Sequence, residues 1–166
     1  MTVATPDTAA DTRRRLRAAV EHGDHAAAVS LFADDIVLNS PIIGSARFEG
    51  REAVGNLMGA VIETFDDLHY TAEGEAGELQ VLAFRARVRG RDIETVDLIR
   101  VNDAGLITEF TVLIRPMAGL AAVAVALGPH IGRGPVRSFL ARALAAPLAV
   151  LLRIAEPLIP RLIRTR

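Results

Sequence analysis

The sequence contains no cysteine, no tryptophan and no lysine, and it has a single tyrosine, Tyr70. Without cysteine, disulfides and thiolate chemistry are excluded, and a metal site would have to use histidine and carboxylates alone. All 19 basic residues are arginine, which together with the abundant alanine indicates GC-rich bacterial coding. Long apolar runs are also missing: Ala143 to Leu152 gives ten residues, against the roughly 20 that a spanning helix needs. The polar start, Thr2 to Asp11, lacks the apolar core of a signal peptide, so we expect a cytoplasmic protein.

The composition is that of a folded globular protein. Of its 166 residues, 51% are apolar and 23% are charged, which is enough apolar material for one domain with a core and an appendage. The net charge of −1 hides an asymmetry. Residues 1–115 carry a charge of −7, whereas residues 116–166 carry +6. Opposite charges on the two parts indicate different roles.

The hydrophobic pattern predicts an α+β domain. Helices are expected at 11–22, from Asp24 over a short stretch, and at 51–65; a strand is expected at 35–40 and ends at Pro41. Four strands follow at 68–75, 79–89, 91–101 and 106–115, and their short connections imply antiparallel pairing. An alanine-rich helix at 117–127 would complete the domain. We therefore expect a flexible N-terminus at 1–10, a domain at 11–127, and a basic, apolar helical extension at 128–166. The extension begins with a hinge made of Gly128-Pro129 and Gly132-Arg133-Gly134-Pro135.

One carboxylate lies on an otherwise apolar strand face. Alternate residues of a strand point to opposite sides, so the strand 91–101 presents Asp97 together with Ile93, Thr95, Ile99 and Val101. This pattern favours a polar group in an apolar cavity, where burial raises the pKa of the carboxyl group. The alternative is a structural aspartate that bonds a helix N-terminus or a buried hydroxyl.

Several short motifs, in order, resemble a known family. They are Gly23-Asp24, Leu31-Phe32-Ala33-Asp34-Asp35, Pro41 with Gly44, Gly50-Arg51-Glu52-Ala53-Val54, and Val96-Asp97-Leu98-Ile99-Arg100-Val101 followed by Gly105-Leu106-Ile107. Over about residues 11–116 they resemble the SnoaL-like branch of the nuclear-transport-factor-two-like family, which includes ketosteroid isomerases, limonene-epoxide hydrolases and polyketide cyclases. The resemblance implies a cone-shaped, cystatin-like α+β barrel, in which three N-terminal helices pack on a curved, mainly antiparallel sheet.

The resemblance also implies roles for a few residues. Asp97 matches the protonated aspartic acid of ketosteroid isomerases and a catalytic aspartate of the epoxide hydrolases. Ser40 replaces the isomerase base, and the isomerase tyrosine falls near Leu16, so a conventional ketosteroid isomerase is not expected. Asn39 matches the asparagine that holds water in the epoxide hydrolases. Thr95 replaces their arginine, and Val112 falls near their second aspartate.

We therefore expect a small-molecule pocket without metal or organic cofactor. Asp97, Asn39 and Ser40 are the candidate catalytic residues; Asn39 and Ser40 fit equally well as groups that tie off a strand end. His69 fits either a group at the pocket mouth or a surface histidine, and core packing explains the apolar candidates equally well. The candidate ligand-binding residues are Phe48, Met58, Phe65, His69, Phe84, Thr95, Phe110 and Val112.

Two functions remain open from the sequence. The first is a pocket for an apolar, oxygen-bearing molecule, such as a terpenoid, steroid or polyketide, with acid–base epoxide hydrolysis, isomerisation or cyclisation. The second is a non-catalytic ligand-binding or scaffold dimer. We expect a homodimer through the sheet and no nucleic acid, because Glu94 and Glu109 lie near the arginines at 85, 87 and 89 and no aromatic platform is present. Residues 136–166 could contact the inner face of a membrane peripherally, the pocket mouth or a second subunit.

Overall fold

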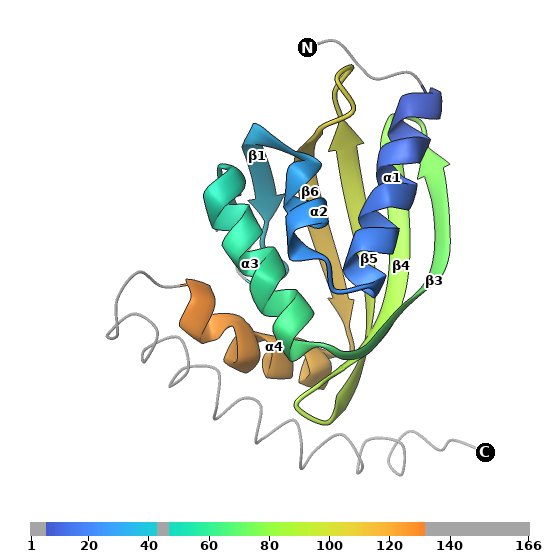
Figure 1. Cartoon of the computed structure of the whole chain (residues 1–166). Helices are drawn as coiled ribbons and strands as arrows, with labels where there is room; N and C mark the ends of the chain where they lie inside the picture. Colours follow the sequence, from blue (N-terminus) through green and yellow to red (C-terminus); the bar gives the residue numbers. More distant parts are fainter. Residues whose placement is uncertain (1–5, 43–46, 132–166) are drawn as a thin grey trace, which may run out of the picture.

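The computed structural model describes residues 6–42 and 47–131 (Figure 1). Its helices are α1 (Pro6–Glu21), α2 (His25–Ser30), α3 (Arg51–Thr64) and α4 (Met117–Ile131). Its strands are β1 (Phe32–Asn39), β2 (Arg47–Glu49), β3 (Asp66–Ala76), β4 (Leu79–Val88), β5 (Arg91–Val101) and β6 (Ile107–Arg115). These elements confirm the α+β class that the hydrophobic periodicity predicts.

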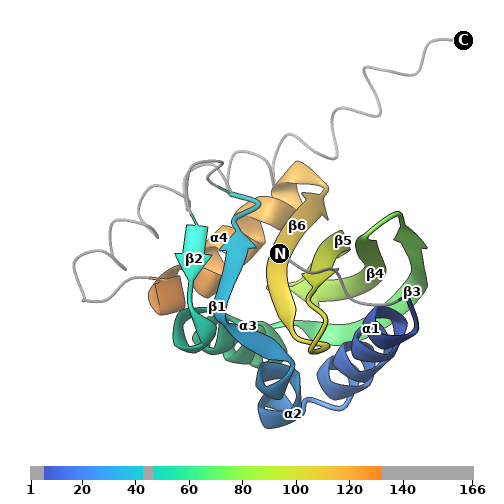
Figure 2. The ribbon, with the colours of Figure 1, turned by 90° about the horizontal axis from the view of Figure 1, so that it is seen from above.

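The six strands form one curved sheet that does not close into a barrel. Their order is β2-β1-β6-β5-β4-β3, so that β2 and β3 are the two edges. The meander β3 to β6 is antiparallel throughout, as its short connections predict. After the long connection through β2, α3 and the first three meander strands, β6 returns to pair with β1 in parallel. Figure 2 shows the curvature from above, with α1, α2 and α3 lying along the concave side.

The structure corrects several expected boundaries. α1 begins at Pro6, not at residue 11, and β1 begins at Phe32, three residues before the expected start. The stretch 44–50, which we expected to be a loop, contains the short strand β2. α4 continues through Pro129 to Ile131, so that no break occurs at Gly128-Pro129, and the second part of the expected hinge, residues 132–135, lies outside the described residues. Because Pro129 has no backbone N–H, the helix continues past it without the hydrogen bond to the carbonyl group four residues earlier.

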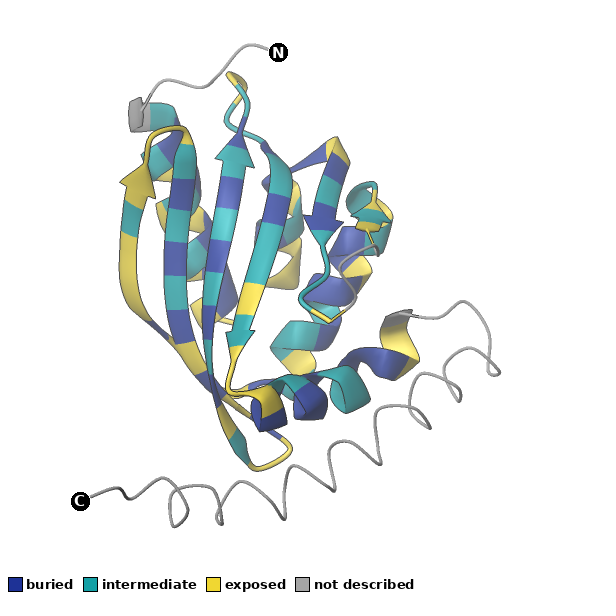
Figure 3. Cartoon of the chain, turned by 180° about the vertical axis from the view of Figure 1, so that it is seen from behind, coloured by how far each residue is buried: buried dark blue, intermediate teal, exposed yellow. Residues whose placement is uncertain are grey.

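The apolar side chains divide the interior into two regions along the strands. At the end nearer the N-terminus of α1 the interior is fully packed, and Leu16, Phe32, Ile36, Ile99 and Ile107 are almost inaccessible to solvent. Each such side chain contributes about 1.5–3 kcal/mol through burial. At the opposite end, α4 lies across the strand ends (Figure 3). The space between α4, the sheet and α3 contains the candidate site.

The absence of a side chain at Gly119 allows α4 to approach the sheet closely. A Cβ atom at this position would lie 2.5 Å from Cγ2 of Ile93 on β5 and 3.2 Å from the carbonyl oxygen of Asp92. No Cβ atom tolerates 2.5 Å, so any larger residue would push α4 away from β5. The glycine therefore fixes the position of the helix that closes this end of the interior.

Among the described residues, no helix is long and apolar enough to cross a membrane. The expected boundary at residue 128 falls inside α4. The helices expected beyond it, including the stretch 136–166 that we considered for membrane contact, lie outside the described residues.

Candidate functional site: an apolar cavity with a buried acid

The site is a cavity of ≈ 70 Å³ between the concave face of the sheet and the helices, at the end that α4 covers. Its wall is almost entirely apolar. Among the described residues, the polar side chains in the wall are Ser40, Tyr70, Thr95 and Asp97. The apolar lining residues are Val20, Leu38, Pro41, Ile42, Phe48, Leu57, Met58, Val61, Phe65, Leu68, Phe84, Phe110, Val112, Ile114, Val123 and Leu127.

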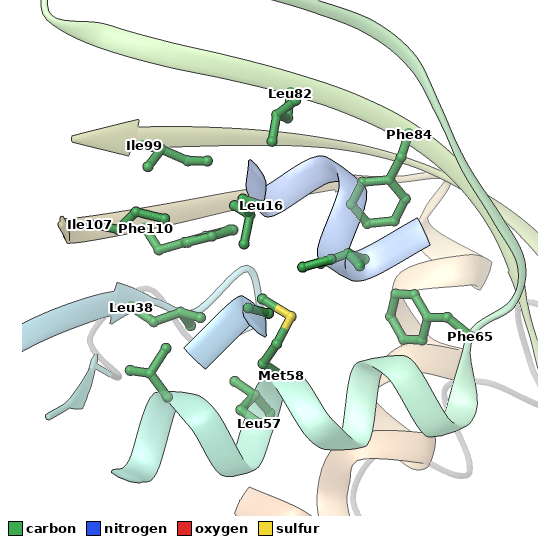
Figure 4. Close-up of a cluster of buried hydrophobic side chains, with 14 of the residues drawn as sticks. Leu16, Leu38, Leu57, Met58, Phe65, Leu82, Phe84, Ile99, Ile107 and Phe110 are labelled. Carbon is green, nitrogen blue, oxygen red and sulfur yellow. The ribbon is translucent and has the colours of Figure 1, made fainter. Parts of the chain in front are cut away.

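Aromatic and flexible side chains form much of the wall. Phe65, at the end of α3, faces Phe84 of β4 with ring centroids 6.4 Å apart, and Met58 projects from α3 toward the sheet (Figure 4). Phe84 also makes an edge-to-face contact with Tyr70, at 5.4 Å between centroids. Such aromatic pairs hold one another in place, whereas methionine adapts its shape through three rotatable bonds. The wall thus has a rigid side and a side that can adjust to a ligand.

Asp97 is the buried acid of this cavity. Its residue is 4% exposed, and burial raises the pKa of its carboxyl group from 3.8 to about 8. Desolvation is the sole cause of this shift, and within the described part of the chain no hydrogen bond or ion pair reaches the carboxyl group. Because its pKa lies above 7, Asp97 is mostly protonated at neutral pH. It therefore presents an O–H donor, not a negative charge, to the cavity.

The strand register explains why Asp97 points into the cavity. Along β5 the buried residues are Ile93, Thr95, Asp97, Ile99 and Val101, and the residues between them are less buried. This is the face that the alternation in the sequence predicts. The neighbours of Asp97 across the sheet are Leu82 on β4 and Val112 on β6, neither of which can form a hydrogen bond through its side chain. The structural alternative, in which Asp97 bonds a helix end or a hydroxyl, does not occur among the described residues.

Thr95 contributes a second polar group to the same wall. It is 2% exposed, and its Oγ1 atom is buried without a hydrogen-bond partner in the described structure. Its neighbours across the sheet are Phe84 on β4 and Ile114 on β6. Two unpartnered polar side chains, two residues apart on one strand, therefore face the same small apolar space.

Tyr70 is a cavity residue that our sequence analysis did not identify. It lies on β3 opposite Phe84 and is 8% exposed. Burial, and then the nearby Asp97, raise the pKa of its phenol well above 10, so the hydroxyl group remains protonated. Regular pairing counted from the turn between β3 and β4 would have placed Thr71 opposite Phe84, and a register shift between Tyr70 and Ala72 brings Tyr70 there instead.

Most of the other predicted residues also lie in the wall. Ser40 lines the cavity, and its Oγ accepts a hydrogen bond from the backbone N–H of Ile42 at 3.1 Å. Ser40 therefore combines a cavity position with the role of tying off the end of β1. The other predicted residues found in the wall are Phe48, Met58, Phe65, Phe84, Thr95, Phe110 and Val112.

Asn39 and His69 do not lie in the cavity, which corrects our expectation for both. Asn39 follows the inward-pointing Leu38 on β1 and therefore points to the outer face, where its Nδ2 donates to Glu109 Oε1 at 3.0 Å and Thr111 Oγ1 at 2.8 Å. It cannot hold a water molecule beside Asp97. His69 precedes the inward-pointing Tyr70 and is exposed, with its Nδ1 2.8 Å from the backbone oxygen of Asp67.

The arginines of β4 lie on the outer face of the sheet and pair with acids. Arg85 contacts Glu94 at 2.6 Å, and Arg87 contacts Asp92 at 3.1 Å. Glu94 also pairs with Arg115, and hydrogen bonds from Arg115 and Arg85 lower the pKa of its carboxyl group. These arginine and acidic side chains line a depression of ≈ 720 Å³ on the outer face, and their ion pairs largely neutralise its charge. This arrangement supports a solvated or protein-facing surface for the arginine row.

The described residues contain no group of three or more histidine and acidic side chains that could hold a metal ion. In the cavity itself, Asp97 is the only carboxyl group among the described residues. The chemistry of the cavity wall is therefore that of hydrogen-bond donors in an apolar surrounding.

Comparisons with known proteins place this geometry in context. A family model described as a SnoaL-like domain matches residues 13–110. No curated protein sequence matches the chain. A steroid delta-isomerase from Pseudomonas aeruginosa is 30% identical, with a TM-score of 0.68, and the match covers 85% of this chain and 99% of that one.

Two further solved structures are similar. A bacterial protein with a cystatin-like fold from Silicibacter pomeroyi is 28% identical, with a TM-score of 0.68, and the match covers 80% of this chain and 92% of that one. RV0760c from Mycobacterium tuberculosis, in complex with estradiol-17beta-hemisuccinate, is 24% identical with a TM-score of 0.54, and covers 66% of this chain and 98% of that one. The cone-shaped fold of this chain therefore recurs in several solved bacterial proteins.

Proposed function

The chain belongs to the SnoaL-like family, and on that premise we propose that its cavity binds an apolar small molecule through one oxygen atom of the ligand. The observation that carries this proposal is Asp97, a protonated carboxyl group in an apolar wall, with no hydrogen-bond partner among the described residues. A buried donor without a partner costs about 1–3 kcal/mol. A ligand oxygen that accepts this hydrogen bond recovers that cost, so the cavity favours a carbonyl, ether or epoxide oxygen over a hydrocarbon.

The size of the cavity limits the ligand. Its ≈ 70 Å³ is less than the roughly 150 Å³ of an engineered cavity that takes up benzene, and small-molecule sites usually measure about 300–1,000 Å³. A six-membered ring therefore requires the wall to move, and Met58 is the side chain best suited to do so. A neighbour of the same fold binds a steroid derivative, which supports a cyclic apolar ligand here.

Acid catalysis is the further step that Asp97 supports. A carboxyl group with a pKa of about 8 can donate its proton to an epoxide or carbonyl oxygen near neutral pH. Proton removal from carbon or activation of water also requires a base, and the described wall contains none besides ionised Asp97. Isomerisation or epoxide opening would therefore use Asp97 for both proton transfers, and binding without turnover is the competing outcome.

Binding to a mono-oxygenated ring tests the proposal. Cyclohexanone can be titrated into the protein while the fluorescence of Tyr70 is followed, because the chain has no tryptophan and one tyrosine, which lies in the wall. We expect Asp97→Leu to lower cyclohexanone affinity about tenfold, since a lost hydrogen bond of about 1.4 kcal/mol gives that factor. Asp97→Asn keeps a donor and should lose less, and the hydrocarbon methylcyclohexane should not distinguish the three proteins.

Equal cyclohexanone affinities for the wild type and Asp97→Leu would contradict the proposed role of Asp97. Catalysis is tested separately with a panel of cyclic epoxides and enones. If turnover is the same in the wild type and Asp97→Asn, Asp97 is not a catalytic residue.

We also propose that the outer face of the sheet binds a second copy of the chain. An apolar patch lies there in register across three strands: Ala83, Val96 and Leu113 pair side by side, and Leu113 is 54% exposed. The patch separates an arginine-rich row, Arg85–Glu94–Arg115, from a pair at the other strand ends, Arg100–Glu109.

A two-fold axis through the patch supports this assembly, because it would place each positive row over the more acidic end of the partner. The charged residues of the depression at that second end are four acids, Asp35, Glu78, Asp103 and Glu109, and two arginines, Arg47 and Arg100, so its net charge is negative. Leu113→Arg should therefore convert a dimer to a monomer in sedimentation velocity runs, while Leu113→Ile should not. A wild-type monomer at all accessible concentrations would refute this assembly and leave the binding proposal intact.

A further inference from the structure

Thr95 is an unexplained feature of the cavity. Its Oγ1 is buried and lacks a hydrogen-bond partner in the described structure, although valine has nearly the same shape and would occupy the same space without a polar atom. Buried hydroxyl groups without a partner are rare in folded proteins, and each calls for an explanation. The hydroxyl group carries a cost that packing alone does not require.

Its surroundings in the sheet cannot supply the missing partner. Phe84 and Ile114 flank Thr95 in register on the two neighbouring strands, and both side chains are hydrocarbon. The next residue on the same face is Asp97, whose carboxyl group also lacks a partner in the part of the chain that the structure describes. Both polar groups line the same cavity. The open hydrogen-bonding capacity of Thr95 is therefore directed at whatever occupies that space.

We infer that the natural ligand carries two oxygen functions on one edge of an apolar skeleton, and that Thr95 binds the second one while Asp97 binds the first. This inference rests on the proposed function and extends it to the substrate class. Asp97 in its protonated form donates, so the first function is an acceptor such as a ketone oxygen. A threonine hydroxyl both donates and accepts, so the second is a hydroxyl or carbonyl group.

The strand geometry sets the distance between the two functions. Residues two apart on a strand are separated by about 6.6–6.8 Å along its axis, and the longer aspartate side chain can lean toward the ligand. Oxygen atoms about 4–7 Å apart on the same edge match this spacing. A hydroxyketone with the two groups in 1,3- or 1,4-positions on a ring meets this requirement and offers each side chain an oxygen atom of its own.

The competing explanation is a water molecule that bridges Thr95 and Asp97. A cavity in which two polar side chains face the same space can hold one water molecule. In that case a second hydroxyl group on the ligand only replaces the water and adds little affinity. The two explanations therefore predict different preferences between matched ligands.

The test compares cyclohexanone with 3-hydroxycyclohexanone, again by Tyr70 fluorescence. We expect the wild type to prefer the hydroxyketone, and we expect Thr95→Val to lose about tenfold more affinity for the hydroxyketone than for cyclohexanone. Thr95→Ser keeps the hydroxyl group and should retain the preference. Without ligand, Thr95→Val should melt at a higher temperature than the wild type, because the variant has no unpaired buried hydroxyl group.

The outcomes separate this inference from the function on which it rests. If the wild type binds both probes equally, or if Thr95→Val weakens both to the same extent, Thr95 does not recognise a second oxygen function and the inference is overturned. If cyclohexanone binding is independent of Asp97, the proposed function itself fails. If neither probe binds the wild type, both fail together.

Discussion

The buried carboxyl group of Asp97 makes the stability of the protein depend on pH in a defined way. Its pKa is 3.8 in an unfolded chain and about 8 in the fold. Between these values the folded state binds the proton and the unfolded state does not, so the free energy of unfolding decreases as pH rises. The protein keeps the full contribution of Asp97 to its free energy of unfolding below about pH 4. It loses this contribution as pH rises toward about 8, and no further loss from Asp97 occurs above that pH.

The magnitude follows from the two pKa values. Each pH unit between them changes the free energy of unfolding by about 1.4 kcal/mol, which gives about 4 kcal/mol between pH 4.5 and pH 7.5 as an upper estimate. Asp97→Asn has no ionisable group at this position, while all other titrating residues are shared. Between pH 4.5 and pH 7.5 the wild type should therefore lose about 4 kcal/mol of unfolding free energy relative to Asp97→Asn.

Urea denaturation of both proteins at half-unit steps from pH 4 to pH 9 measures this difference. The pH at which the difference levels off reports the pKa of Asp97 in the folded protein, and the slope reports that a single proton is involved. Parallel stability profiles for the wild type and Asp97→Asn would show that the carboxyl group is not held neutral, and the account of the cavity as a donor site would be wrong.

Three further results are expected. Cyclohexanone affinity should stay constant up to about pH 7 and fall as pH passes about 8, the pKa of Asp97. The reason is that a carboxylate cannot donate a hydrogen bond, and isothermal titration at several pH values measures the change. Gly119→Ala should cost about 1–3 kcal/mol of stability by thermal unfolding, since its Cβ would clash with Ile93 at 2.5 Å, whereas Gly74→Ala, with no neighbour within 4 Å, is the neutral control. Met58→Ala should cost about 2–5 kcal/mol yet tighten binding of larger cyclic ketones, which competition titrations against cyclohexanone can show.

The sequence predicted the parts of the site that depend on regular alternation. β5 has a clear period of two, and this period alone assigned Thr95 and Asp97 to one face. β1 reads Ile36-Val37-Leu38-Asn39, in which three consecutive apolar residues conceal which side points inward. The family resemblance therefore suggested a role for Asn39 that its position on the outer face does not allow.

Local irregularity explains the misplaced His69 and the missed Tyr70. Asp67 has a positive φ of 54°, and the pairing of β3 with β4 shifts register at two places. These features set which of the two neighbouring rings points inward, and neither is visible in the composition of the strand. The volume of the cavity was also beyond prediction, because it depends on how side chains from α3, α4 and the sheet pack together.

The two ends of the cavity have different origins along the chain. The acid and hydroxyl of β5 lie within residues 13–110, which match the family model, whereas the α4 residues Val123 and Leu127 that close the cavity lie beyond that match. The segment that we propose binds the ligand's oxygen atoms is thus separate from the segment that closes the cavity. Exchange of α4 alone offers a way to change the size of the accepted molecule without disturbing the groups that bind its oxygen atoms.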